Sequence, residues 1–218
     1  GETVTLNGSK VYVPLAATAD HFLVYAKNTE TGKPEAYIVN CETKGVTVGK
    51  REGLMGVRAL PTHHLTLHDV VVNASCRVGG AVGIDYEALL NRSRVALGAL
   101  AVGVAKAAFD YAREYAKQRV QFGAPIATKQ AIAFMLAEMA IEVDAARLMV
   151  WEAAWKLDEG VDATQEAYLA KEYASKAAMT VCDGAVQTLG GYGFIREYPV
   201  ERYLRNARGF ASFTGLAI

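Results

Sequence analysis

The spacing of apolar residues divides the chain into two stretches with different periods. From residue 3 to about 82, short apolar runs alternate with polar residues at a period of two, which is typical of β-strands with one buried face. From about residue 83 onward, apolar residues recur at helical spacing over longer segments. The pattern predicts an α+β chain, with an antiparallel β domain over residues 1–82 and a helical domain over 83–218.

The first stretch predicts the strands of an antiparallel sheet or small barrel. Asn7 and Gly8 stand between two alternating segments, and an Asn-Gly pair favours a two-residue hairpin turn. We therefore expect two short strands within residues 3–13. Further strands are expected at 21–27, 35–40, 46–50 and 64–72, divided by turn-rich polar segments.

The second stretch predicts long helices over about 85–119, 128–159 and 163–189, and a short helix over 198–207. The breaks "VQFGAP" and "GGYGF" contain glycine or proline, which end helices. Long helices joined in this way favour an antiparallel four-helix-type bundle. Large apolar residues of the second helix are assigned to the bundle core: Met135, Met139, Met149, Trp151 and Trp155.

Composition and charge narrow the classes of function. The 23 basic residues balance the 23 acidic ones, so no basic face for nucleic acid is implied. The longest strongly apolar run, 95–105, is too short to span a membrane, and no signal-peptide pattern is present. The cysteines, Cys41, Cys76 and Cys182, are odd in number and far apart. Reduced thiols therefore fit better than disulfides, and the expected location is the cytoplasm, or the mitochondrial matrix in a eukaryote.

Three histidines lie close together, but their spacing does not predict a metal site. His63, His64 and His68 fall in a segment with period-two alternation, so His64 and His68 share one face of a strand and His63 points to the other. No carboxylate or cysteine stands at a spacing that would complete a set of ligands. We expect no bound metal.

Four segments, taken together and in order, resemble the acyl-CoA dehydrogenase family. "LNGSKVYV" resembles "LNGxKxWIT", and "GLMGVRALPTHHLTLHDVVV" resembles "KMGxRGSxTxxLxFxDVxVP". "RVQFGAPIATKQAIAFMLAEM" resembles "RxQFGxPIxxxQAIxFxLADM", and "AVQTLGGYGFIREYPVERYLRNA" resembles "AxQxxGGYGYxxEYPVERxxRDA". The family's N-terminal helical domain and its "TEPxxGSD"-like segment have no counterpart, which leaves a fragment and a truncated member as alternatives.

The resemblance implies a bound FAD and assigns residues to it. Arg119 matches the arginine that reaches the FAD pyrophosphate. An arginine suits this contact because its guanidinium pairs two phosphate oxygens at once. Taken alone, Arg119 would also suit a cation at a helix end. Tyr12 matches the aromatic residue near the flavin ring. Family contacts to the adenosine half, which come from a neighbouring subunit, match Gln121, Phe122, Ile126, Gln130, Gln187, Gly190 and Gly191.

The resemblance also locates the substrate end of the site, where the usual base is missing. Arg94 matches an arginine near the substrate mouth, and Phe213 and Gly215 match residues that line the thioester end. Thr214 stands where most members have the glutamate of "YEGT", and Ser93 where a minority place it. A hydroxyl does not accept a proton near neutral pH unless another base activates it.

The departures from the family pattern are asymmetric. The family's "WIT" is replaced by "YVP" at residues 12–14, and Pro14 offers neither a side-chain donor nor an N–H. The segments that match contacts to a neighbouring subunit's FAD, in contrast, keep the family pattern. This favours a subunit of a homo- or hetero-oligomer for FAD-dependent α,β-desaturation of an acyl-CoA, with the base on a partner chain. Electron-transferring flavoprotein is the implied acceptor. A flavoenzyme of the same fold that needs no base and a non-enzymatic homologue are the alternatives.

Overall fold

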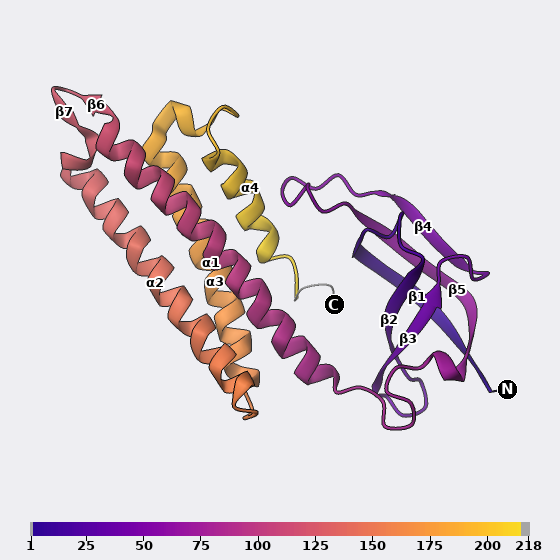
Figure 1. Ribbon diagram of the computed structural model, residues 1–218. Coiled ribbons are helices and arrows are strands. Elements are labelled where there is room, and N and C mark those ends of the chain that lie inside the picture. The colour runs from indigo at the N-terminus through magenta and orange to yellow at the C-terminus, as the bar shows by residue number, and fades with distance from the viewer. Residues whose placement is uncertain (1, 215–218) are drawn as a thin grey trace. The chain divides into compact units, whose positions relative to one another are not determined.

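The computed structural model describes residues 2–214, which form two compact units (Figure 1). The β unit consists of the residues up to Leu54 together with Arg58–Leu89. The helical unit consists of Met55–Val57 together with the described residues from Leu90 onward. Antiparallel sheets in one unit and packed helices in the other confirm the predicted α+β class.

The β unit contains two small antiparallel sheets. The first has the strand order β1-β5-β4 and the second pairs β2 with β3. Alternate residues of both sheets enter one core, which includes Leu6, Val24, Val39, Leu65 and Val70. The strands are β1 (Thr3–Pro14), β2 (His21–Lys27), β3 (Pro34–Asn40), β4 (Val46–Arg51) and β5 (Thr62–Asn73), and a short 3₁₀ turn, η1 (Ala74–Cys76), follows them.

β1 is one continuous strand, so the hairpin predicted at Asn7-Gly8 is wrong. β1 pairs with β5 along its length, with a register shift between Leu6 and Gly8. The Asn7 Nδ2 donates to Oδ1 of Asp69 (3.0 Å), and the Asn7 Oδ1 accepts from the Asp69 N–H (2.8 Å). These bonds stabilise a β-bulge, so the Asn-Gly pair bends the strand and does not reverse it.

The three histidines of β5 lie on the faces that the alternation predicts. His63 is buried, whereas His64 and His68 are exposed. Within residues 2–214, no group of three or more His, Cys, Asp or Glu side chains is placed to hold a metal ion.

The helical unit is a bundle in which α1, α2 and α3 run side by side and α4 packs against α3 (Figure 1). Its core is built largely from alanine and valine, which let the helices approach closely. The helices are α1 (Tyr86–Gln118), α2 (Gln130–Asp158), α3 (Thr164–Leu189) and α4 (Val200–Phe210). The connections contain β6 (Val120–Gln121), β7 (Ala124–Pro125), η2 (Ile126–Thr128) and η3 (Gly190–Gly193).

Two of the five residues assigned to the bundle core lie on the surface instead. Met139 is buried, and Met135 and Met149 pack against the core. Trp151 and Trp155, however, are 62% and 59% exposed. The prediction fails because α2 is apolar on two opposite faces, and a helical period alone does not tell the inner face from the outer one.

α1 is the one helix in the described part of the chain that is long and apolar enough to cross a membrane by length and composition. Its inner face belongs to the bundle core through Ala101, Ala105 and Ala108. At Gly98, a methyl group would come within 3.1 Å of Val150 Cγ2 on α2. The apolar composition of α1 therefore follows from its packing in the bundle.

Candidate cofactor-binding site

An open cavity of about 600 Å³ lies in the helical unit, where α1 and α3 end. Figure 1 shows these two helix ends at the same end of the bundle. The cavity joins two segments, 119–126 and 187–191, that are far apart in the sequence. Its lining includes six of the residues predicted to contact the cofactor: Arg119, Gln121, Ile126, Gln187, Gly190 and Gly191.

The hairpin between β6 and β7 positions the first of these segments. Its two turn residues, Phe122 (φ 54°) and Gly123 (φ 80°), both have positive φ, as a type I′ turn requires. The Ile126 N–H donates to the Arg119 carbonyl (2.8 Å) and closes the hairpin. The Phe122 side chain is 88% exposed at the tip. A bulky residue in this backbone region costs about 1–3 kcal/mol and is common at functional sites.

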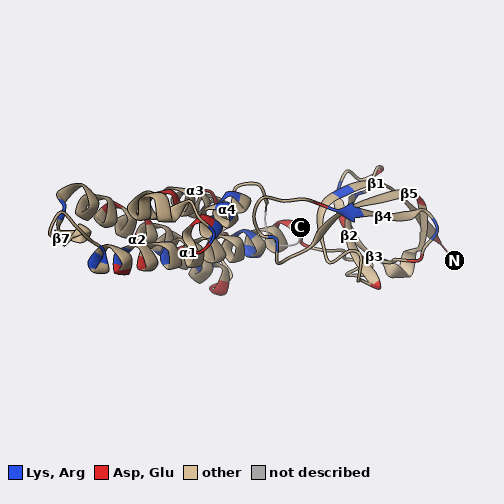
Figure 2. Ribbon diagram, turned by 90° about the horizontal axis from the view of Figure 1, so that it is seen from above, with Lys and Arg blue, Asp and Glu red and all other residues tan. Residues whose placement is uncertain are grey.

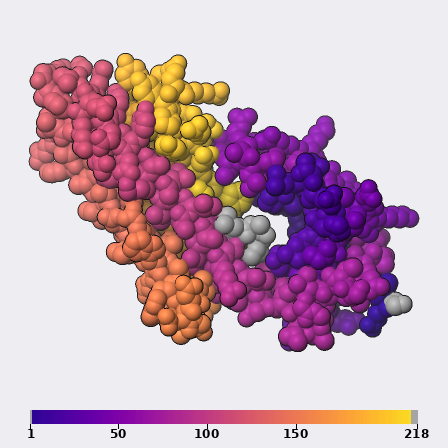
Figure 3. All heavy atoms as spheres, in the orientation of Figure 1, coloured from indigo at the N-terminus to yellow at the C-terminus, as the bar shows by residue number. Residues whose placement is uncertain are grey.

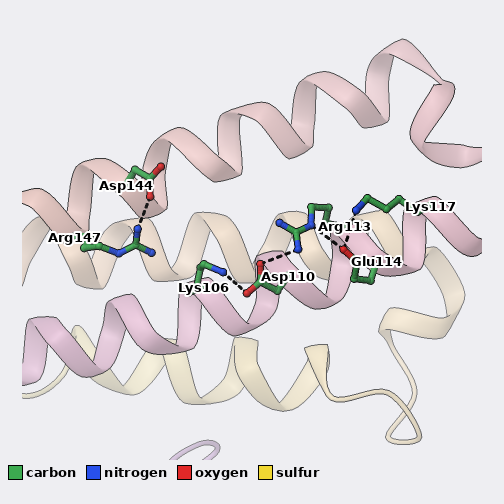
Figure 4. Close-up of polar contacts among 7 residues, drawn as sticks. All are labelled: Lys106, Asp110, Arg113, Glu114, Lys117, Asp144 and Arg147. Atoms are coloured by element: carbon green, nitrogen blue, oxygen red, sulfur yellow. Dashed lines mark hydrogen bonds and ion pairs between the residues drawn. The ribbon is translucent and has the colours of Figure 1, made fainter.

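Arg119 differs from the basic residues that precede it on α1. Arg113 and Lys117 each contact the carboxylate of Glu114 at 3.0 Å (Figure 4). Arg119 is exposed and forms no ion pair with an acidic side chain anywhere in residues 2–214; its guanidinium lies over the Tyr192 ring, 5.6 Å from the centroid. Its charge is therefore free to bind an anionic ligand.

A cluster of tyrosines supports Arg119 and was not predicted from the sequence. The ring centroids of Tyr192 and Tyr198 are 5.2 Å apart, and Tyr115 meets Tyr198 edge-on at 6.4 Å. Burial raises the pKa of Tyr115, so its phenol stays neutral at physiological pH. Tyr115 and Tyr192 line the cavity. In the sequence, Tyr115 stands about one helical turn before Arg119, and Tyr192 is the middle residue of "GGYGF". These positions could have indicated both tyrosines.

The glycines of η3 have two different roles. A Cβ built on Gly190 or Gly191 meets nothing within 4 Å, so their backbone is open to the cavity. A Cβ on Gly193 would lie 2.3 Å from the Val186 carbonyl oxygen, so this glycine is required for packing. The turn therefore both ends α3 and leaves exposed backbone where a ligand can approach closely.

Three predicted cofactor contacts do not line this cavity. Phe122 lies at the hairpin tip, and Gln130 is the exposed first residue of α2. Tyr12 belongs to the β unit, where it sits at a register shift with φ 57°. Its N–H donates to Glu52 Oε1 (3.3 Å).

The predicted substrate residue Arg94 is half-buried near the start of α1. Its Nη1 donates to Asn91 Oδ1 (2.9 Å), and its guanidinium lies 5.7 Å from the Tyr168 ring centroid. Asn91 is itself buried and donates to Thr164 Oγ1 (2.9 Å). This network holds the guanidinium of a residue that is, as a whole, partly exposed.

The two positions where the family carries its base both hold hydroxyl groups. Ser93 is buried on α1, and Thr214 is exposed just beyond α4. Phe213 is half-buried and packs against the bundle core. The predicted contact Gly215 lies outside the described residues. Neither hydroxyl can serve as a proton acceptor unaided.

The segment Met55–Val57 holds α4, the helix that leads to Phe213 and Thr214. The Arg205 Nη1 donates to the Met55 carbonyl (2.8 Å). The Asn206 Oδ1 accepts from the Val57 N–H (2.7 Å). These bonds fix the C-terminal half of α4 and thereby the point where the Thr214 segment begins.

Glu201, one turn earlier on α4, holds the Arg205 guanidinium. Two hydrogen bonds join the groups, from Nε to Oε2 (2.7 Å) and from Nη2 to Oε1 (3.0 Å). The pairing lowers the pKa of the Glu201 carboxyl and raises the pKa of Arg205. Such a bidentate pair orients the arginine toward the Met55 carbonyl.

Comparison with known domains decides the family. The middle domain of acyl-CoA dehydrogenases matches residues 1–70, and their C-terminal domain matches residues 84–216. The chain belongs to the acyl-CoA dehydrogenase family. This confirms the resemblance drawn from the four sequence segments.

Individual relatives agree with this membership of the acyl-CoA dehydrogenases. The short-chain specific acyl-CoA dehydrogenase of Megasphaera elsdenii is 42% identical over 212 residues, which cover 94% of this chain and 55% of that protein. Subunit CarC of the caffeyl-CoA reductase-Etf complex of Acetobacterium woodii is 40% identical over 221 residues, or 99% and 58%. The structure of butyryl-CoA dehydrogenase from Megasphaera elsdenii superimposes with a TM-score of 0.89 at 40% identity, covering 98% of this chain and 57% of that chain. This chain thus spans little more than half the length of these relatives.

Proposed function

We propose that this chain is a subunit of a FAD-dependent oxidoreductase that desaturates an acyl-CoA thioester between its α and β carbons. The observation that carries the proposal is the cavity at the ends of α1 and α3. It gathers Arg119, without an acidic partner in the described residues, two glutamine side chains and open glycine backbone. Family membership and the names of the relatives support an oxidoreductase.

The residues of the cavity fit the pyrophosphate and adenosine parts of FAD. Arg119 would pair two phosphate oxygens, and the amides of Gln121 and Gln187 can donate or accept hydrogen bonds. Gly190 and Gly191 would let the backbone approach the ligand closely. Phe122, held outward at the hairpin tip, and Gln130 would contact the same nucleotide. The FAD held in this cavity would belong to a neighbouring subunit, whereas Tyr12 would pack near the flavin ring of the chain's own FAD. When bound, FAD supplies the acceptor for the hydride from the substrate β carbon.

The chain's own residues explain why a second chain is part of the proposal. Removal of the α proton needs a base within hydrogen-bond reach, and Thr214 and Ser93 provide only hydroxyl groups. The base is therefore placed on a homologous partner subunit, while Arg94 and Phe213 line the thioester end. Electron-transferring flavoprotein is proposed as the electron acceptor, which the Etf complex named for one relative supports. The free cysteines support the cytoplasm as the location.

The test is the visible flavin absorbance of the purified chain, alone and after co-expression with a glutamate-bearing homologue. We expect flavin only in the co-purified complex. Within that complex, Arg119→Ala should weaken FAD binding about tenfold or more, because a charged hydrogen-bond donor to phosphate is lost. Arg113→Ala is the matched control, since Arg113 pairs with Glu114 on the same helix.

Other outcomes would contradict the proposal in distinct ways. Flavin in the lone chain would favour a flavoenzyme of this fold that needs no base. The absence of flavin from both preparations would leave a non-enzymatic homologue. Equal flavin content in the Arg119→Ala and Arg113→Ala variants would show that the cavity does not bind FAD through Arg119.

A further inference from the structure

The β unit contains a cavity of about 490 Å³ that the proposed function does not use. Its wall is formed by β4, the start of β5, the residue after β3 and the connection between β1 and β2, all within one compact unit. Figure 3 shows atoms of the early strands, in indigo, beside purple atoms of the later ones on one face of this unit. Alanines of the connection and Val48 make part of the wall apolar, whereas Cys41, Lys50, Arg51 and His63 bring polar groups to it. The volume is within the range of sites that hold small molecules.

His63 is the residue that points to a ligand in this cavity. It lines the cavity and is only 7% exposed, and its Nδ1 has no hydrogen-bond partner among the residues that the structure describes. Buried polar atoms are nearly always paired, so an unpaired imidazole nitrogen at a cavity wall calls for a partner. An imidazole N–H can donate to an oxygen of a ligand, and a carboxylate is an acceptor of this kind.

The charges around the cavity favour an anionic ligand. Lys50 and Arg51 end β4, and Figure 2 shows the end of this strand in blue. Neither forms an ion pair with an acidic side chain within residues 2–214; the Arg51 Nη2 donates instead to the Arg58 carbonyl (2.6 Å). None of the described residues that line the cavity is acidic. Two cations without acidic partners raise the local concentration of an anion.

Cys41 gives the cavity a nucleophile. Its N–H donates to the Asp20 carbonyl (2.9 Å), which ties the residue after β3 to the residue before β2. The Asn40 Oδ1 accepts from the Glu42 N–H (2.8 Å) and fixes the turn that follows. The thiol is free, and the residue is half-buried at the cavity wall. Reactive cysteines are typically found in partly exposed places with basic neighbours.

We propose that this cavity binds a small disulfide that carries carboxylates, and that Cys41 exchanges with it. The Cys41 thiol loses its proton to water, and the thiolate attacks one sulfur of the bound disulfide. A new S–S bond to Cys41 forms, the original S–S bond breaks, and the other half leaves as a thiolate. The disulfide is itself the two-electron oxidant, and attack by a free thiol of the same class reverses the step. The proposal goes beyond the proposed function and does not depend on it.

The other two cysteines differ from Cys41 in ways that make them controls. Cys76 is also half-buried, but it does not line the cavity, and its neighbour Arg77 is paired with Glu35 at 2.9 Å. Cys182 is buried in the helical bundle, and this burial raises the pKa of its thiol to about 12. Cys182 is therefore expected to stay inert. The contrast between Cys41 and Cys76 isolates the effect of the cavity.

The experiment compares two disulfide probes on the full chain: the dianion dithiobis(nitrobenzoate) and the uncharged dithiodipyridine. Cys41 is measured alone in Cys76→Ser, and Cys76 alone in Cys41→Ser, with mass spectrometry to locate the adduct. We expect the ratio of the anionic to the neutral rate to be at least about tenfold higher at Cys41 than at Cys76. Taking this ratio cancels differences in the intrinsic reactivity of the two thiols.

Substitutions in the cavity wall test the basic groups directly. Lys50→Gln, in the Cys76→Ser background, should slow the anionic probe about threefold or more and leave the neutral probe unchanged, because one attracting charge is lost. Lys44→Gln is the matched control, since Lys44 is exposed in the turn before β4 and does not line the cavity. His63→Leu should also slow the anionic probe, and Lys50→Gln keeps the test valid if His63→Leu does not fold.

Three results would overturn the proposal. One is an equal ratio of anionic to neutral rates at Cys41 and Cys76. Another is a Lys50→Gln variant that behaves like Lys44→Gln with both probes. The third is a Lys50→Gln variant that slows the two probes equally, which would show altered access to the thiol rather than loss of an anion site.

Discussion

At Gly56 the absence of a side chain determines how tightly two backbone segments approach. A Cβ there would lie 1.9 Å from the Arg205 carbonyl oxygen, well inside any real contact. The neighbouring Val57 has φ 52°, which is unfavourable for a β-branched residue. Its N–H bond to Asn206 (2.7 Å) is part of what holds it there.

We therefore predict that Gly56→Ala destabilises the protein by about 2 kcal/mol or more, because the 55–57 segment must move away from α4. The measurement is the midpoint of thermal unfolding by circular dichroism. Gly53→Ala is the control, since a Cβ there meets nothing within 4 Å. Equal midpoints for the two variants would show that the close approach does not matter.

At the scale of the elements, periodicity predicted where helices lie better than which way they face. The helix expected over 163–189 is α3 (Thr164–Leu189). The period of α2 was also recognised, yet Trp151 and Trp155 were assigned to the wrong side. Both of its faces are apolar, so the pattern holds no information on which one is inside. The hairpin predicted at Asn7-Gly8 was wrong for a similar reason, because an Asn-Gly pair suits a β-bulge as well as a hairpin turn.

The ion pair on α4 gives that element a pH dependence. Arg205 lowers the pKa of Glu201 in the folded chain. A carboxyl with a depressed folded pKa stabilises the fold above its unfolded pKa, about 4.3, and loses this contribution as pH falls through the folded pKa. We predict that wild type is more stable than Glu201→Gln at pH 7 and that the difference shrinks below about pH 4.

Urea unfolding midpoints across this pH range would measure the effect. Glu197→Gln, at an exposed position just before α4, serves as the control. A difference between wild type and Glu201→Gln that stays constant from pH 7 to pH 3 would contradict the assignment.

At the scale of the whole molecule, the sequence predicted part of the site and the fold supplied the rest. Motif segments led to Arg119 and Gln187, which the structure brings to one cavity. Tyr115 and Tyr192 were missed, since their place beside Arg119 follows from how the ends of α1 and α3 meet. The roles of these residues stay predictions. The Phe122 side chain is exposed at the hairpin tip, which fits a contact completed by a second chain. The sequence of one chain does not contain that contact.

Restoring the missing carboxylate tests whether the site is otherwise intact. We predict that Thr214→Glu alone does not give the turnover of an active acyl-CoA dehydrogenase, because Pro14 also departs from the family pattern and offers no donor. The measurement is anaerobic bleaching of the flavin absorbance by butyryl-CoA in the co-purified complex, with the glutamate of the partner subunit replaced by glutamine and the double variant Pro14→Thr/Thr214→Glu measured beside it. Full activity from Thr214→Glu alone would show that Pro14 is harmless.

The placement of Met55–Val57 has a consequence for how this protein can be divided. These residues lie between β4 and β5 in the sequence, yet they belong to the compact unit formed by the helices. One compact unit therefore contains a segment from within the sequence of the other, and division of the chain at a single position does not yield two complete units. A recombinant fragment starting at residue 83 would lack the backbone groups that receive Arg205 and engage Asn206. Exchange of the helical part between relatives would succeed only if the 55–57 segment travelled with it.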